Sequence, residues 1–239
     1  CVFLTGFFYD RISKKQERKN VITRLIIEQR LIALKAQINP HFISNSLTAI
    51  QQLIIENNID KANQYIAKFS FLIRYTLNYS DKSAACLRNE LDIIDLNVEL
   101  ERLRFSNKFI FEKQIDDDID LDEIFIPPLI TQPLIENAIW HGLMPLRDER
   151  IPKLILKIEI VDETLIISVI DNGVGRPEKM QGAIQTKRES RGTWLVMNRI
   201  SNLNRLHPQN KSEFRFTDLV APDGSPAGSR VDLLFPLNV

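Results

Sequence analysis

The sequence predicts an α+β protein, in which a helical hairpin in the first third of the chain precedes a domain built on strands. Apolar residues recur three and four positions apart between about residues 20 and 80, which is the period of amphipathic helices. Residues 153–161 and 164–170 alternate apolar and polar side chains around a short acidic turn, as a β-hairpin does. With 239 residues, 44% of them hydrophobic, the chain can bury the cores of roughly one or two domains.

Charge and cysteine content exclude two classes of protein. The chain has 31 Lys and Arg residues against 31 Asp and Glu residues, so its formal net charge is zero. It therefore lacks the basic surface of a nucleic-acid binder, and we expect no direct nucleic-acid partner. The two cysteines, Cys1 and Cys86, fit neither a disulfide framework nor a zinc spacing, which agrees with a reducing compartment.

The first 20 residues have the character of a membrane anchor. Residues 1–9, CVFLTGFFY, are too few to cross a bilayer, because a spanning helix needs about 20. The basic segment at 10–19 follows at once, as at the cytoplasmic end of a transmembrane helix. We expect residues 1–20 to be a residual transmembrane end and juxtamembrane linker, and the native protein to be anchored at the cytoplasmic face of the inner membrane. The alternative is a hydrophobic strand or helix start that packs on the domain.

Two amphipathic helices are expected next. Residues 10–57 have the helical pattern, and the seam in its first part suits a short parallel coiled coil. Asp60 is placed to cap a second helix, so that residues 21–85 form a hairpin and two chains form a four-helix bundle, a homodimer. The seam is Ile22, Leu25, Gln29, Ile32 and Ala36; the apolar positions after Pro40 are Phe42, Ala49, Leu53 and Ile43, Leu47, Ile50, Ile54; those of the second helix are Ile59, Ala62, Ile66, Phe69, Ile73 and Leu77.

Pro40 and His41 interrupt this pattern within QINPHFISNSL, residues 37–47. Proline removes a backbone donor and costs about 3 kcal/mol in a helix interior, so we expect a kink before His41 and a functional position there. Neutral imidazole can act as a nucleophile at cytoplasmic pH. The alternative is a solvated surface histidine after a helix break. The polar stripe that carries it is Gln37, His41, Asn45, Thr48 and Gln52.

The second half begins with a strand at 108–115 and an acidic connector at 116–123, followed by IPPLITQPLIENAIWHGL, residues 126–143. Pro128 suits the first turn of a helix, and Gly142 is placed to end it. Glu136 and Asn137 project from the face beside the apolar one. The inward residues of this helix are Leu134, Ile135, Ala138 and Ile139.

The strand at 164–170 runs directly into DNGVGRP, residues 171–177. A carboxylate at a strand end, followed by two glycines, lets the backbone approach a ligand that Asp171 can hydrogen-bond. A helix at 193–206 and strands at 213–219 and 229–237 complete the predicted domain.

Three of these segments, QINPHFISNSL, PLITQPLIENAIWHGL and DNGVGRP, resemble the phosphoacceptor box, the N box and the first glycine box of LytS/YehU-type sensor histidine kinases. Residues 87–105 resemble the helix that joins the two modules of that family, and the resemblance covers most of residues 30–236. It implies a two-layer α/β sandwich of the GHKL ATPase (Bergerat) type at 86–239.

The resemblance also implies roles for residues of the first two boxes. His41 matches the phosphoacceptor, and Asn45 is its companion in the box. Asn137 would hold Mg2+ against the phosphates of ATP, and Glu136 would orient or polarise the attacking group. His141 and Gly142 would close that helix beside the nucleotide. Taken singly, Glu136 could be a solvated glutamate and Asn137 a buried amide.

In the third box, the resemblance implies that Asp171 binds the adenine amino group and that Gly173 and Gly175 leave room for adenine and phosphates. Residues 176–192 would form a lid whose basic side chains reach the nucleotide, with Gly192 in the second glycine box; these side chains are Lys179, Lys187, Arg188 and Arg191. An ordinary solvated loop is the alternative. The family box usually has a second glycine where this chain has Trp194, which predicts weakened ATP binding.

Phosphoryl transfer needs in-line positioning and charge neutralisation more than covalent machinery, and the predicted parts suffice for it. The expected function is a sensor histidine kinase that phosphorylates His41 from Mg-ATP and passes the phosphoryl group to an aspartate of a response regulator. The alternative from another class is a pseudokinase scaffold that signals by dimer conformation. A further ATPase of the same nucleotide fold would not need the helix that carries His41.

Overall fold

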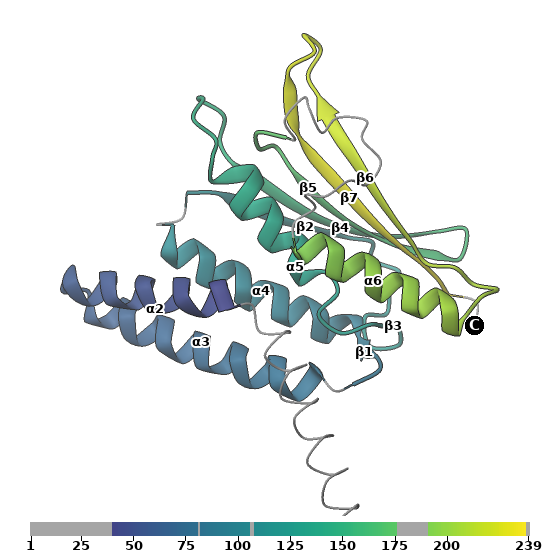
Figure 1. Ribbon diagram of the computed structural model, residues 1–239, viewed down its shortest axis with the longest axis horizontal. Helices are drawn as coiled ribbons and strands as arrows, with labels where there is room; N and C mark the ends of the chain where they lie inside the picture. The colour runs from purple at the N-terminus through teal and green to yellow at the C-terminus, as the bar shows by residue number, and fades with distance from the viewer. Residues whose placement is uncertain (1–39, 81, 106–107, 176–190, 238–239) are drawn as a thin grey trace, which may run out of the picture. The chain divides into compact units, whose positions relative to one another are not determined.

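The computed structural model describes residues 40–80, 82–105, 108–175 and 191–237 (Figure 1). The chain divides into two compact units, Cys1–Ala49 and Ile50–Val239. The predicted membrane end, the coiled-coil seam at 22–36 and most of the lid lie outside the described residues. Among those that are described, no helix combines the length and the apolar character that a membrane span requires.

Helix α2 spans Pro40–Ile55. The predicted kink depends on residues before Pro40, which are not described. Of the two apolar sets, the one with Phe42 and Ala49 is buried, whereas Leu47 and Ile54 are exposed.

Helix α3 spans Ile59–Ser80 and is capped by Asn58, whose Oδ1 accepts the backbone N–H of Lys61 at 3.4 Å. Asp60 lies in the first turn instead of at the cap, where its charge still suits the helix dipole. The buried residues of α3 repeat every three or four positions. They are Ala62, Tyr65, Leu72 and Thr76, whereas Ile59, Ile66 and Leu77 are exposed in the single chain.

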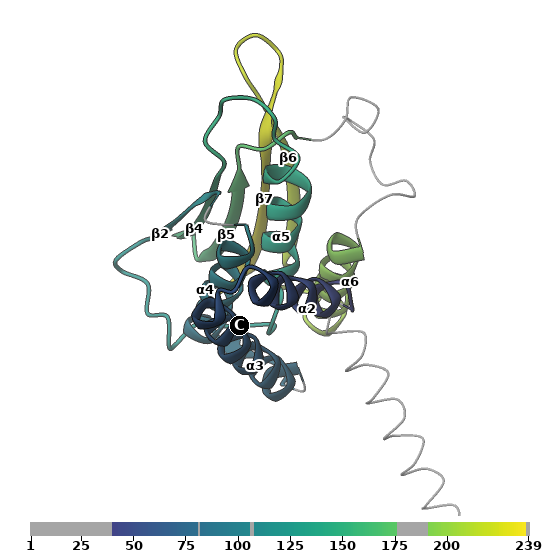
Figure 2. The ribbon, with the colours of Figure 1, turned by 90° about the vertical axis from the view of Figure 1, so that its left-hand side faces the viewer.

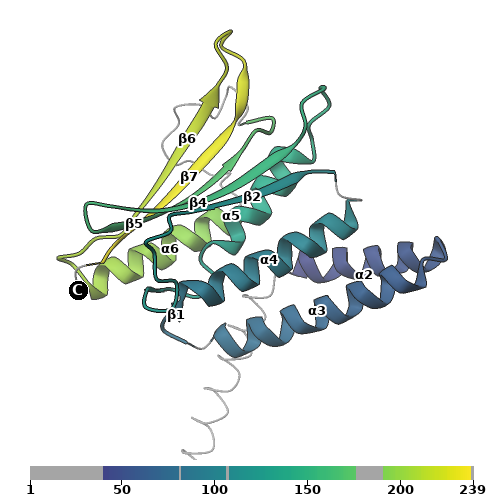
Figure 3. The ribbon, with the colours of Figure 1, turned by 180° about the vertical axis from the view of Figure 1, so that it is seen from behind.

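Five strands form one sheet in the order β2-β4-β5-β7-β6 (Figure 3). β2 is parallel to β4, and every other pair is antiparallel. The predicted hairpin is confirmed, with Val161 opposite Thr164. A short antiparallel pair, β1 with β3, lies apart from this sheet. The bounds are β1 Ala85–Cys86, β2 Ile110–Ile115, β3 Phe125–Ile126, β4 Lys153–Val161, β5 Thr164–Asp171, β6 Glu213–Val220 and β7 Pro226–Pro236.

Helices cover one face of this sheet, which makes a two-layer sandwich (Figure 2). They are α4 (Leu87–Arg104), α5 (Gln132–Asn137), the π-helix η1 (Ala138–Leu143) and α6 (Arg191–Leu206). Alternate strand residues enter the shared core, for example Leu154, Leu156 and Ile158 from β4. The predicted α+β fold class is confirmed, including the helices at 87–105 and 193–206.

The start of α5 differs from the prediction. The helix begins at Gln132 and carries Pro133 in its first turn, so Pro128 precedes it. Leu129, in between, has a φ of 58°, which is the left-handed region and costs roughly 1–2 kcal/mol for a residue other than glycine. Gly142 does not end the helix; it lies inside η1, one residue before its last.

Candidate nucleotide and phosphoryl-transfer site

Glu136 and Asn137 are the last two residues of α5, and η1 continues directly from them. Both are half-buried, because the next face of the helix carries the apolar side chains into the core. That face is as predicted: Leu134, Ile135, Ala138 and Ile139 are buried. Glu136 accepts a hydrogen bond from the side chain of Gln132 at 3.0 Å. The buried apolar face of α5 thus holds the backbone of Glu136 and Asn137 in place.

The start of α6 lies against Asn137. The side-chain amide of Asn137 donates a hydrogen bond to the hydroxyl of Thr193 at 3.2 Å. A Cβ added to Gly192 would lie 3.1 Å from Cβ of Pro133 and 3.3 Å from Nδ2 of Asn137. Gly192 and Thr193 of the second glycine box therefore contact Pro133 and Asn137 of the N box. Thr193 was not identified from the sequence.

Asp171 ends β5 and is almost fully buried. Its Oδ1 accepts the backbone N–H of Gly173 at 2.9 Å, and its Oδ2 accepts the hydroxyl of Ser229 at 2.5 Å. Burial raises the pKa of Asp171, and these hydrogen bonds oppose the rise. Ser229, which comes from β7, was not identified from the sequence.

Gly142 and Gly173 allow two segments to touch. A Cβ on Gly142 would lie 2.6 Å from Oδ1 of Asp171, and one on Gly173 would lie 2.2 Å from the backbone of Gly142. The N–H of Val174 donates to the carbonyl of Gly142 at 3.0 Å. Gly175 has a φ of 64°, which favours glycine. The end of the N box and the first glycine box are therefore one continuous structure.

The loop between η1 and β4 is tied to the same glycine box. Nη1 of Arg150 donates to the carbonyls of Asn172 and Gly173 at 3.2 and 3.4 Å. The side chain of Asn172 accepts the N–H of Lys153 at 2.7 Å and donates to the carbonyl of Ile151 at 2.8 Å. Neither Arg150 nor Asn172 was predicted as a site residue.

Glu90 of α4 holds the segment before the N box. Its two oxygens accept the backbone N–H groups of Leu129 and Thr131 at 2.7 and 2.8 Å, and so brace the left-handed turn. Arg199 of α6 donates to the carbonyl of Pro128 at 2.6 Å. Burial raises the pKa of Glu90, against the opposing effects of the two N–H groups and of Arg199.

The C-terminal turn of α4 holds Trp140, inside the N box. The guanidinium carbon of Arg104 lies 4.0 Å from the centre of the Trp140 ring, and the ring of Phe105 meets it edge-on at 5.0 Å. Oε2 of Glu101 lies 3.8 Å from Nη1 of Arg104. Burial raises the pKa of Glu101 to about 7; nearby Glu136 adds to the rise and Arg104 opposes it.

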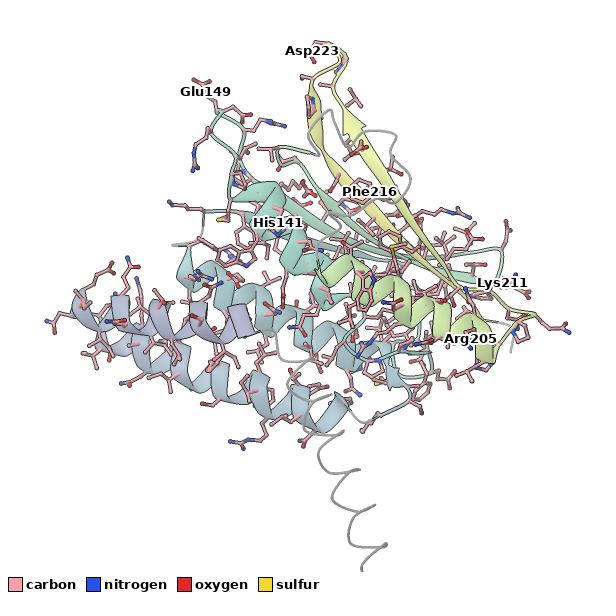
Figure 4. The ribbon with its side chains drawn as sticks, in the orientation of Figure 1. His141, Glu149, Arg205, Lys211, Phe216 and Asp223 are labelled. Carbon is pink, nitrogen blue, oxygen red and sulfur yellow. The ribbon has the colours of Figure 1, made fainter. Side chains whose placement is uncertain are left out.

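The structure places the other predicted residues as follows. His141 is exposed on η1 (Figure 4). His41 and Asn45 belong to α2, where Asn45 is half-buried and the side chain of His41 is not described. Lys187 and Arg188 are outside the described residues. The structure thus brings Glu136 and Asn137 to one end of the N box, and Gly142, Asp171 and Gly173 to the other.

The implied Mg2+ fits a ligand set shared with ATP. In the described part of the chain, no three His, Cys, Asp or Glu side chains gather in a way that could hold a metal ion. Mg2+ usually takes only one or two protein groups and completes its shell with phosphate oxygens and waters. A single amide oxygen, that of Asn137, is compatible with such a site.

Trp194 lies in the first turn of α6 and is 61% exposed. It is therefore not a core residue of that helix, and its indole is free of the packing that would hold a buried aromatic ring. The prediction that Trp194 weakens ATP binding is compatible with this exposed position.

Comparisons with known proteins agree with these motifs. The histidine kinase family matches residues 29–109. The chain is 34% identical over 206 residues to YwpD of Bacillus subtilis, which covers 85% of this chain and 69% of that protein. It is 34% identical over 194 residues to the sensor histidine kinase YesM of the same organism, with 80% and 32% covered. It is 29% identical over 211 residues to the sensor protein LytS of Oceanobacillus iheyensis, with 83% and 35% covered. The chain thus spans about a third of the length of YesM and of LytS.

Proposed function

This chain belongs to the LytS-type sensor histidine kinases, and from that premise we propose that it phosphorylates His41 from Mg-ATP and passes the phosphoryl group to an aspartate of a response regulator. The observation that carries most weight is the junction of Gly142, Asp171 and Gly173. No side chain fits between these backbones, and a buried carboxylate stands at their meeting point.

This junction suits the adenine of ATP. Asp171 is held by Gly173 and Ser229 and cannot turn away, so its carboxylate is a preorganised acceptor for an exocyclic amino group. The phosphates would then extend along the N box toward Asn137. This residue hydrogen-bonds Thr193 in the first turn of α6. A helix N-terminus favours anions through its free N–H groups.

The chemistry asked of the remaining residues is modest. Mg2+, held by Asn137 and the phosphates, would supply charge neutralisation. A ring nitrogen of His41 forms a bond to the γ-phosphorus as the bond to the leaving ADP oxygen breaks. Glu136 accepts the proton of the other ring nitrogen, which keeps the attacking nitrogen nucleophilic. The phosphohistidine then donates its phosphoryl group to a carboxylate of the response regulator.

The proposed assembly is a homodimer at the cytoplasmic face of the inner membrane. Ile59, Ile66 and Leu77 support the dimer, because α3 exposes them on its surface and a second hairpin would bury them. Light scattering at high protein concentration tests this assembly, and a monomer would contradict it.

The second candidate is a pseudokinase scaffold that signals by dimer conformation. One observation favours it: Trp194 stands where the family has a glycine, at the start of α6 beside Asn137 and Thr193. A bulky residue there restricts the positive φ and close approach that a phosphate-binding turn uses.

The two candidates differ in one measurement. The protein is incubated with radiolabelled ATP and Mg2+, and the incorporated phosphate is tested for acid lability and base stability. A kinase gives labelled protein, and the His41→Gln variant of a kinase gives none while it still binds nucleotide. Labelled His41→Gln protein would rule out His41 as the acceptor, and unlabelled wild-type protein would favour the scaffold.

A further inference from the structure

The turn at residues 128–131, which leads into α5, is held by charged side chains of two different helices. Glu90 of α4 accepts two of its N–H groups, and Arg199 of α6 donates to one of its carbonyl groups. We propose that Glu90 and Arg199 are positioning residues for phosphoryl transfer, which fix the start of α5 and thereby the place of Asn137 at its end. This inference rests on the proposed kinase function and adds two residues to it that the motifs do not contain.

The conformation of this turn depends on groups from elsewhere in the chain. Leu129 has a φ of 58°, in the left-handed region, which a residue other than glycine adopts only at a cost in free energy. The N–H groups of Leu129 and Thr131 donate to the two carboxylate oxygens of Glu90 at 2.7 and 2.8 Å, across 39 and 41 residues of sequence. Strained backbone persists where the surrounding structure holds it, and it concentrates at functional sites.

Thr131 connects Glu90 to the first turn of α5. Its N–H group donates to Oε1 of Glu90 at 2.8 Å. Its carbonyl group accepts the N–H groups of Leu134 and Ile135 at 3.0 and 3.2 Å, which are the first hydrogen bonds along α5. One residue therefore carries both the bond to α4 and the bonds that begin α5, so the position of Glu90 sets where α5 starts.

Helix α6 holds the same stretch of chain at both ends. Arg199 donates to the carbonyl group of Pro128 at 2.6 Å. Thr193, in the first turn of the same helix, accepts the side-chain amide of Asn137 at 3.2 Å. The two contacts come in opposite order along the two segments, so α6 runs antiparallel to the stretch that it holds. A tilt of α5 would therefore disturb a bond at one end or the other.

Helix α5 is short enough for a tilt at its start to reach Asn137. At about 1.5 Å of rise per residue, Asn137 lies about 8 Å along the axis from Gln132. A tilt of about 10° would move Asn137 by about 1 Å, and a displacement of that size at reacting groups can cost on the order of a hundredfold in rate. Because Asn137 is the proposed Mg2+ ligand, loss of the two contacts should impair the use of Mg2+. The adenine junction at Asp171 has its own support from Gly173 and Ser229 and should be unaffected.

The burial of these two residues argues for a role beyond stability. Glu90 is 1% exposed, and Arg199 is half-buried. Burying a charged group costs free energy unless hydrogen bonds replace its water, and both groups direct such bonds to the main chain of a single turn. Apolar residues of similar volume are often as stabilising as buried charges. Charges that fix one strained turn therefore suit a role in setting geometry.

The test compares Arg199→Met, which removes the donor to Pro128, with Arg199→Lys, which keeps one. We expect Arg199→Met to lower the maximal rate of His41 labelling at saturating ATP at least tenfold, and to raise the Mg2+ concentration at half-maximal rate at least threefold. The Kd of ADP without Mg2+, which reports on the adenine junction, should stay within threefold of wild type. Arg199→Lys should retain at least a third of the wild-type rate. Arg205→Met, at an exposed position of the same helix, is the matched control and should stay within twofold.

Glu90→Gln tests the contact with α4, because an amide oxygen and an amide nitrogen cannot both accept an N–H group. It should lower the rate and raise the Mg2+ requirement as Arg199→Met does, with circular dichroism at the assay temperature showing that each variant is folded. If Glu90→Gln does not fold, Arg199→Met decides alone. Wild-type labelling by Arg199→Met, an unchanged Mg2+ requirement, an ADP Kd that rises as the rate falls, or an unfolded Arg199→Met protein would overturn the positioning role alone. An unlabelled wild-type protein would overturn the proposed function together with it.

Discussion

The carboxyl group of Glu101 gives a quantitative prediction for stability as a function of pH. Burial raises its pKa from the ordinary 4.5 to about 7 in the folded protein. In the unfolded chain the group titrates at its ordinary value. Between these two pKa values the folded state holds a proton that the unfolded state has lost, so the unfolding free energy falls as the pH rises.

The size of this effect follows from the two pKa values. Below the ordinary pKa both states are protonated, and Glu101 contributes no pH dependence. Above about pH 7 both are ionised, and the penalty is complete at about 3 kcal/mol, since each pH unit between the two values contributes about 1.4 kcal/mol. The group is almost fully buried, so solvent does not screen this penalty.

Glu101→Gln removes this titration. We expect the variant to gain about 3 kcal/mol relative to wild type between pH 4.5 and pH 8. The attraction between Arg104 and the ionised carboxylate opposes the rise in the pKa of Glu101 and is therefore already part of the folded-state value. Glu90 and Asp171, whose pKa values burial also raises, are present in both proteins, so their contributions cancel.

The assay is urea unfolding followed by far-UV circular dichroism, at a fixed protein concentration because dimerisation would stabilise the fold. Glu99→Gln is the control, since Glu99 lies on the same helix but is exposed and paired with Lys68; it should change the unfolding free energy by less than about 1 kcal/mol. Parallel wild-type and Glu101→Gln curves across this pH range would show that Glu101 is ionised in the folded protein at low pH, and would refute the reasoning.

Three further predictions concern single positions. Asn137→Asp should reduce Mg2+-dependent labelling at least tenfold, because an added carboxylate changes charge and geometry at the phosphates; unchanged turnover would remove Asn137 from the site. Trp194→Gly should tighten ATP severalfold in a nucleotide titration, because it restores backbone freedom at the start of α6, and equal affinities would contradict this. Glu163→Gly should raise the unfolding free energy by about 1 kcal/mol in a thermal melt, because Asp162 and Glu163 both have positive φ in the β4–β5 turn, where Asp-Gly is preferred.

Local patterns predicted the elements that depend on neighbouring residues. The β4–β5 hairpin and the inward face of α5 follow from apolar periodicity, whereas α4 was expected from the family resemblance. Their ends were less certain: Asn58 caps α3 in place of Asp60, and Pro133, not Pro128, opens α5. In each case the sequence offers two similar residues a few positions apart, two polar ones at the start of α3 and two prolines near the start of α5. Packing decides which of the two is used.

Contacts between distant segments were beyond local patterns. Asn137 meets Thr193 and Asp171 meets Ser229, in each case more than 50 residues along the chain. Which residue of the last strand faces Asp171 depends on the register between β5 and β7, where Asp171 lies opposite Ser229. A one-residue slip would turn that side chain to the other face of the sheet. The motifs therefore identified Asn137 and Asp171, whereas Thr193 and Ser229 could be identified only from the folded structure.

One signal in the sequence did point to the part of the site that the motifs omit. Positions 90, 94, 97 and 101 are spaced four, three and four apart, so they form a single stripe on α4. Three of them are polar, Glu90, Asn97 and Glu101, yet all three are buried. A stripe that is polar on the face toward the core contradicts the rule that buries apolar residues, and such local conflicts are expected where function outweighs stability. Here Glu90 accepts the N–H groups of Leu129 and Thr131, so the conflict marks the helix that supports the segment before the N box.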